Sequence, residues 1–157
     1  MTGPATTRSA STTVARTPVQ TASLVFGLVF LIVGVLGFIP GITTDYGKMS
    51  FAEYHSGAML FGIFQISVLH NLVHLAYGVV GVAAAKVLAS ARTYLIVGGM
   101  VYLALWLYGL FINGNSAANW LPMNTADNWL HFVLGLVMIG AVFLRPPATA
   151  TVDRPVA

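Results

Sequence analysis

The chain has 157 residues, of which 57% are hydrophobic and only 7% are charged, and its mean hydropathy is +0.84. This composition excludes an ordinary water-soluble domain and indicates a protein that lies in a membrane. Cysteine is absent, which excludes a disulfide framework, a thiolate metal site and a cysteine nucleophile.

Four apolar segments span most of the chain. Each is close to the length of about 20 residues that crosses a hydrocarbon core of about 30 Å. We therefore predict transmembrane helices at residues 21–39, 63–85, 94–112 and 128–144. The two ends of the chain have few large apolar side chains to bury, so residues 1–18 and 146–157 are expected to be disordered cytoplasmic tails. The predicted fold class is all-α, a four-transmembrane-helix bundle over residues 19–145.

Six of the seven cationic residues fall on one side of the predicted bundle, and only Lys48 falls on the other. The six are Arg8, Arg16, Lys86, Arg92, Arg145 and Arg154. The positive-inside rule makes their side cytoplasmic. We expect a multi-pass protein of the inner (plasma) membrane, with the N and C termini in the cytoplasm and the lipid bilayer as its partner. Whether the protein forms a homo-oligomer or joins a larger membrane assembly stays open. The sequence has no basic patch with interleaved aromatic residues, so a nucleic-acid partner is not expected.

Two segments connect the predicted helices on the outer side. Residues 40–58 are expected to form an outer loop, because Pro40-Gly41 ends the first helix and polar residues follow. Asp127 stands where the fourth helix is expected to begin. A carboxylate there can accept hydrogen bonds from free backbone N–H groups and interact with the positive end of the helix dipole. We therefore predict that Asp127 is the N-cap of this helix.

The segment SVLHNLVHLAYGVVG, residues 67–81, places polar side chains inside an apolar helix. Steps of three and four residues keep one set of small and polar residues on a single face, and His70 flanks this stripe. The stripe consists of Ser67, Asn71, His74, Gly78, Gly81 and Ala85. The fourth helix has a counterpart in Asn128, His131, Gly135, Met138 and Val142. In lipid, small residues allow close approach and polar residues hydrogen-bond across helices, so we expect the second and fourth helices to pack through a polar His/Asn seam.

Three interpretations of the polar residues stay open. In the first, the imidazoles and amides only fix packing, and the protein is a non-enzymatic membrane component without a cofactor. In the second, His70, His74 and His131 bind a transition metal, or His131 and one histidine of the second helix bind a haem axially. In the third, the same residues line a proton path or a small transporter. The sequence shows no nucleophile with its base and no nucleotide motif, so an enzyme is the less expected case.

Further signals concern close packing and repetition. Gly27 and Gly34 in the first helix, and Gly98-Gly99 in the third, predict close approach of neighbouring helices. Leu69-His70 and Leu130-His131 each follow an outer segment and open an inward-running helix, which suggests two related hairpins.

Four stretches of the chain carry a resemblance to a known family. They are GFIPGIT (37–43), SGAMLFGIFQISVLHNLVHLAYGVVG (56–81), ARTYLIVGG (91–99) and NTADNWLH (124–131). From about residue 18 to 145 the chain resembles the bacterial integral membrane family known as domain of unknown function 4383. The resemblance implies a four-helix membrane architecture. That family has no established activity, substrate or cofactor, so the resemblance leaves the function open.

Overall fold

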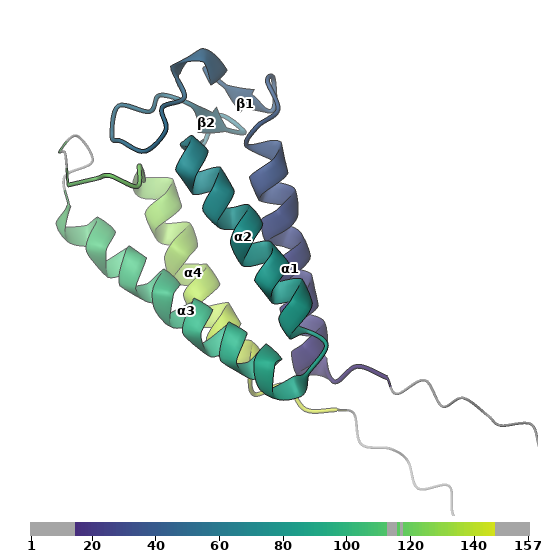
Figure 1. Ribbon diagram of the computed structural model, residues 1–157. Helices are drawn as coiled ribbons and strands as arrows, with labels where there is room; N and C mark the ends of the chain where they lie inside the picture. The colour runs from purple at the N-terminus through teal and green to yellow at the C-terminus, as the bar shows by residue number, and fades with distance from the viewer. Residues whose placement is uncertain (1–14, 113–115, 117, 147–157) are drawn as a thin grey trace, which may run out of the picture.

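The computed structural model describes residues 15–112, 116 and 118–146. Most of this part of the chain is helical, and its α-helices are α1 (Pro18–Leu36), α2 (Val68–Ala84), α3 (Leu88–Phe111) and α4 (Thr125–Ala141). Between α1 and α2 lie the strands β1 (Thr43–Thr44), β2 (Met59–Leu60) and β3 (Phe64–Gln65), with the 3-10 helix η1 (Tyr46–Lys48). Figure 1 shows the sheet at one end of the helices, and the start of α1 and the end of α4 at the opposite end. The predicted tails fall largely outside the described residues.

The helix boundaries differ from the predicted ones by several residues. α2 begins at Val68 and not at residue 63, because the hydroxyl of Ser67 accepts a hydrogen bond from the His70 N–H at 3.1 Å and acts as the N-cap. The residues before this cap pair as β3 instead. The other three helices begin earlier than expected, at residues 18, 88 and 125 instead of 21, 94 and 128.

A small sheet accompanies the predicted helices, and β1 and η1 lie within the expected outer loop at residues 40–58. β2 pairs antiparallel with both β1 and β3. Beneath it, Ala58, Leu60 and Ile66 are buried and pack against apolar side chains of α1. Each strand has only two residues, so the alternation of apolar and polar residues that identifies strands is too short to see in the sequence.

The helices associate as two hairpins, α1 with α2 and α3 with α4 (Figure 1). A Cβ added at Gly78 would lie 2.7 Å from the carbonyl oxygen of Gly27, and one at Gly135 would lie 2.9 Å from the carbonyl oxygen of Gly99. The predicted close packing at Gly27 and Gly99 is confirmed. The second and fourth helices, which were expected to pack through a polar His/Asn seam, meet at His70 and His131, whose ring centroids are 6.3 Å apart. The glycines of these stripes face α1 and α3, because only a glycine allows two helix backbones to approach this closely.

The two hairpins form an internal repeat. α2 and α4 both have 17 residues, and their N-caps, Ser67 and Asn124, are also equivalent. Each residue of α2 has its counterpart in α4 57 positions later, as Asn71 and Asn128 show. Each residue of α1 has its counterpart in α3 72 positions later, as Gly27 and Gly99 show. Three contacts between the helices of the first hairpin recur in the second. Gly27–Gly78 corresponds to Gly99–Gly135, Leu31–Gly78 to Leu103–Gly135, and Gly37–Asn71 to Gly109–Asn128.

This register differs from the one that the sequence suggested. It makes His74 the counterpart of His131, and His70 the counterpart of Asp127. The sequence paired Leu69-His70 with Leu130-His131, which is four residues, or one helical turn, away from the structural register. The sequence suggested two related hairpins through a different pair of residues, because the register depends on which glycines face the partner helix.

Candidate functional site

Three histidines from two helices meet beneath the sheet. The ring centroids of His70 and His74, both on α2, are 4.6 Å apart, and their planes differ by only 13°. The ring of His131 on α4 lies 6.3 Å from that of His70. Only 4% of His70 and 3% of His131 is exposed. The imidazoles thus form one buried cluster at the junction of the two hairpins.

The backbone of α2 orients this cluster. Ser67 holds the first turn through the His70 N–H, as described above. Nδ1 of His74 lies 3.0 Å from the carbonyl oxygen of His70, one turn earlier in the helix. A carbonyl oxygen can only accept, so Nδ1 carries the proton and Nε2 of a neutral His74 is the free acceptor.

An aromatic pair lies against the histidines. Phe30 of α1 and Tyr102 of α3 stack with their centroids 5.5 Å apart and their planes 8° apart. Phe30 contacts His74 at 5.6 Å, and Tyr102 contacts His131 at 5.1 Å between centroids. These contacts are equivalent in the two hairpins. Phe30 and Tyr102 are 72 positions apart, and His74 and His131 are 57 positions apart, which are the two offsets of the repeat. The centre of the cluster therefore follows the internal repeat.

A small cavity adjoins the cluster. Its volume is about 80 Å³, and its polar lining consists of His70, His74, Asp127 and His131. This volume has room for about two or three water molecules. Among the described residues, Nδ1 of His70 and Nδ1 of His131 have no hydrogen-bond partner. Two of the histidines that line the cavity thus each retain a buried ring nitrogen with unused hydrogen-bonding capacity.

The arrangement of the rings bears on metal binding. The planes of His70 and His74 are nearly parallel, so the lone pairs of the two rings do not converge on one point. One nitrogen of His74 is also occupied by the backbone of His70. In the part of the chain that the structure describes, no group of three His, Cys, Asp or Glu side chains is arranged to hold a metal ion.

Asp127 has a different role from the predicted one. The N-cap of α4 is Asn124, whose side-chain oxygen accepts from the Asp127 N–H at 3.0 Å. Oδ2 of Asp127 accepts from the N–H groups of Asn124 and Gln65, each at 2.9 Å. Asp127 is the third residue of α4 and completes a capping box. The same carboxylate connects α4 to β3, and it is only 3% exposed.

The remaining predicted site residues do not join the cavity lining. Ser67 acts on the backbone of α2. Asn71 is buried against Gly37, and its Nδ2 lies 4.0 Å from the sulfur of Met49. Asn128 takes the equivalent position against Gly109 in the second hairpin. Each amide therefore faces the partner helix of its own hairpin. Asn71 directly follows His70, and Asn128 directly follows Asp127. Consecutive residues of a helix point in different directions, so the amides do not share the cavity with the residues before them.

Several residues of the site were not found from the sequence. Nothing in the sequence distinguishes Phe30 or Tyr102 from the other aromatic residues of the apolar segments. The spacing Asn124-x-x-Asp127 is that of a capping box and could have identified the true start of α4. No local signal marks Gln65, because its backbone N–H reaches Asp127 only after the sheet has folded.

Comparison with known proteins places the chain in a family. The family model described as domain of unknown function (DUF4383) matches residues 20–144. No curated protein and no solved structure matches the chain significantly. The matched range contains all four helices except the first two residues of α1, and it includes the sheet and the histidine cluster. The chain therefore belongs to the DUF4383 family.

Proposed function

We propose that the protein is a four-span integral membrane protein. The observation that carries this proposal is the apolar outer surface of the helices. α1 and α3 are long and apolar enough to cross a membrane, and only 28% of the most apolar window of each is buried. α2 and α4 are shorter, 17 residues each, or about 26 Å, which is near the lower limit for a span. They also expose apolar side chains such as Val79 and Val80 on α2 and Leu136 and Val137 on α4.

The proposed orientation places both termini in the cytoplasm. Arg16, Lys86, Arg92 and Arg145 are exposed at the end of the helices opposite the sheet, and Lys48 is on the sheet side (Figure 1). By the positive-inside rule, the end that carries the four exposed cationic residues then faces the cytoplasm. The sheet and the start of α4 face outward.

Thiol labelling tests this orientation, because the chain has no cysteine of its own. Ser90→Cys introduces an exposed thiol at the start of α3, and Gly47→Cys introduces one beside the sheet, where an added Cβ has open space. In intact spheroplasts, a membrane-impermeant maleimide is expected to label position 47 and to label position 90 only after permeabilisation. The reverse pattern would contradict the orientation, and equal labelling of both positions in intact spheroplasts would contradict the spans.

Within this membrane domain, we infer that the histidine cluster serves packing, and that the protein is a non-enzymatic membrane component. The stacked rings of His70 and His74 support this role, as do the contacts of His74 and His131 with Phe30 and Tyr102. A haem is not favoured, since pockets for organic ligands measure about 300–1,000 Å³ and this cavity measures about 80 Å³. A homo-oligomer or a larger assembly is compatible with the exposed apolar surface.

One observation favours a second candidate function, a proton path. His70 and His131 line the cavity, and Nδ1 of each is buried without a bond to any described residue. Water in the cavity would connect these nitrogens, and buried ionisable groups in a membrane are common parts of proton relays.

One variant separates the packing role from the proton path. With His70→Leu, His74→Leu and His131→Leu combined, we expect a folded protein that loses about 2 kcal/mol of stability or less, because each such contact in a membrane contributes about 0.6 kcal/mol. The measurements are thermal unfolding in detergent and proton flux into proteoliposomes with an internal pH dye. Flux that is present in the wild type and lost in the folded variant would replace the packing role by the proton path. Metal analysis and visible absorption of both proteins test the ligand interpretation in the same samples.

A further inference from the structure

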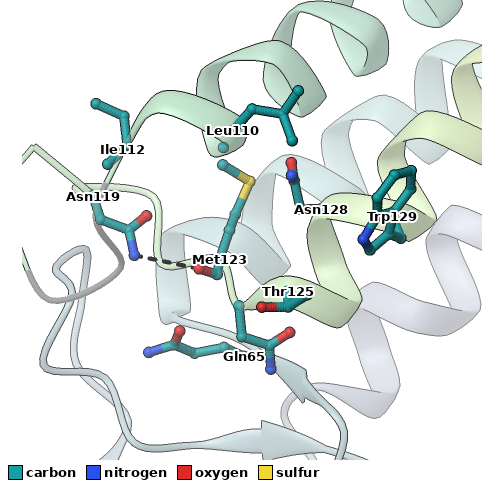
Figure 2. A pocket seen from close by; sticks show the side chains of 10 residues that line it. Gln65, Leu110, Ile112, Asn119, Met123, Thr125, Asn128 and Trp129 are labelled. Carbon is teal, nitrogen blue, oxygen red and sulfur yellow. Dashed lines mark hydrogen bonds between the residues drawn. The ribbon is translucent and has the colours of Figure 1, made fainter.

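A second, larger pocket lies at the sheet end of the second hairpin, apart from the histidine cavity (Figure 2). Its volume is about 460 Å³, which is within the usual range of small-molecule sites. The end of α3 contributes Gly109 and Leu110, the start of α4 contributes Asn128 and Trp129, and Gln65 closes the side toward the sheet. Among the described residues, the ten that line the pocket are all uncharged.

Asn128 lines this pocket, and its side-chain oxygen is a buried acceptor that packs against Gly109 of α3. Only 7% of the residue is exposed, and its Oδ1 has no hydrogen-bond partner among the residues described. In Figure 2 the amide points from α4 toward the end of α3, across the pocket from Gln65. A buried acceptor without a donor is unfavourable. A ligand that donates an O–H or N–H group would satisfy it.

The internal repeat allows Asn128 to be compared with its counterpart in the first hairpin. Asn71 is the counterpart of Asn128, and each packs on a glycine of the preceding helix. In the first hairpin, the connection that carries the sheet also brings Met49 to within 4.0 Å of the Asn71 amide. In the second hairpin, the described residues leave the pocket beside the Asn128 amide instead. The two hairpins have the same helix contacts and differ in how this amide is covered.

We propose that this pocket binds an uncharged polyol, such as a sugar, either free or as the headgroup of a glycolipid. The uncharged lining gives no partner to a phosphate or an ammonium group, whereas hydroxyl groups can donate to Asn128. The hydroxyl of Thr125 is exposed at the same lining. Trp129 is 53% exposed, and its indole offers a flat apolar face with a polar N–H, which suits the C–H face of a sugar ring. Leu110, 49% exposed, provides an apolar border for an acyl chain.

Native mass spectrometry of the full chain in phosphatidylcholine nanodiscs tests the proposal. The probes are maltose, monoglucosyl diacylglycerol and phosphatidylglycerol, each added separately. Glycoside detergents are avoided during purification, because their sugar headgroups would compete. The variants are Asn128→Leu, which removes the acceptor, and Trp129→Ala, which removes the aromatic face from the surface and so preserves the fold. Trp120→Ala is the matched control, since Trp120 is 56% exposed and is not among the lining residues.

The expected result is retention of maltose or the glucosyl lipid in preference to phosphatidylglycerol, with affinity at least tenfold lower in both pocket variants and unchanged in the control. Binding of maltose would identify a free sugar site, and binding of the glucosyl lipid alone would identify a headgroup site; both support the proposal. Failure of the wild type to retain either sugar probe would overturn it. So would equal retention of phosphatidylglycerol, or a Trp129→Ala variant that binds as the wild type does. None of these results depends on the role of the histidines.

Discussion

Gly78→Ala is expected to destabilise the first hairpin by about 1–3 kcal/mol, the range for overpacking at a tight contact. The added Cβ would lie 2.7 Å from the Gly27 oxygen and 2.7 Å from the Leu31 nitrogen. Both are backbone atoms and cannot move aside as a flexible side chain would, so the two helices must separate. Gly135→Ala is expected to have an effect of similar size, because the same contact recurs in the second hairpin.

Gly140→Ala is the matched control for these substitutions. Gly140 is also in α4, but an added Cβ there has no neighbour within 4 Å. Alanine favours a helix over glycine by up to about 1 kcal/mol, so this variant should be as stable as the wild type or more stable. Thermal unfolding in detergent micelles, followed by circular dichroism, provides the comparison. If the substitutions at 78 and 135 were as harmless as the one at 140, the described helix approach would be incorrect.

Asp127→Ala is expected to cost about 3–5 kcal/mol. The substitution removes one carboxylate oxygen that accepts from two N–H groups, those of Gln65 and Asn124. A buried N–H group left without its acceptor costs about 1–3 kcal/mol, and two such groups lose their acceptor here. The sheet should then separate from the start of α4. Hydrogen exchange is expected to show faster exchange at the amides of Gln65 and Asn124, together with a lower unfolding temperature.

Two further variants determine the cause of that loss. Asp127→Asn keeps an oxygen at the position that accepts both bonds, so it should restore much of the stability that alanine removes. Glu53→Ala removes an exposed carboxylate whose 3.7 Å contact with His55 lies at the surface, and it should change stability by less than about 1 kcal/mol. An Asp127→Ala protein with unchanged exchange at Gln65 would refute the proposed connection between α4 and β3.

The internal repeat gives the histidine cavity a specific place in the molecule. All four polar residues of its lining belong to two repeat-related pairs, His70 with Asp127 and His74 with His131. Both hairpins run in the same direction (Figure 1), as in membrane proteins with parallel repeats, whose sites lie at the interface of the repeats. The pair His70 and Asp127 breaks the symmetry. An imidazole in one repeat thus corresponds to the carboxylate that holds the sheet in the other.

Much of the helical fold could be predicted from the sequence alone. The four helices follow from the length and composition of their apolar segments, because the free-energy cost of exposing so much apolar surface to water leaves few alternatives. Helical spacing also placed His74 on the polar stripe of the second helix, with His70 beside it, and His131 on that of the fourth. These features depend on local composition and helical periodicity, which a single sequence contains in full.

Only the tertiary structure decided which helix faces meet. The stripes on α2 and α4 contain both the glycines and the histidines, and helical spacing cannot show that the glycines face α1 and α3 while the histidines meet each other. That choice depends on close backbone contacts such as Gly27 with Gly78. The sheet, and the hydrogen bond from Gln65 to Asp127, join residues 62 positions apart. Contacts at such separations arise from the packing of the whole chain, and no short stretch of sequence contains them.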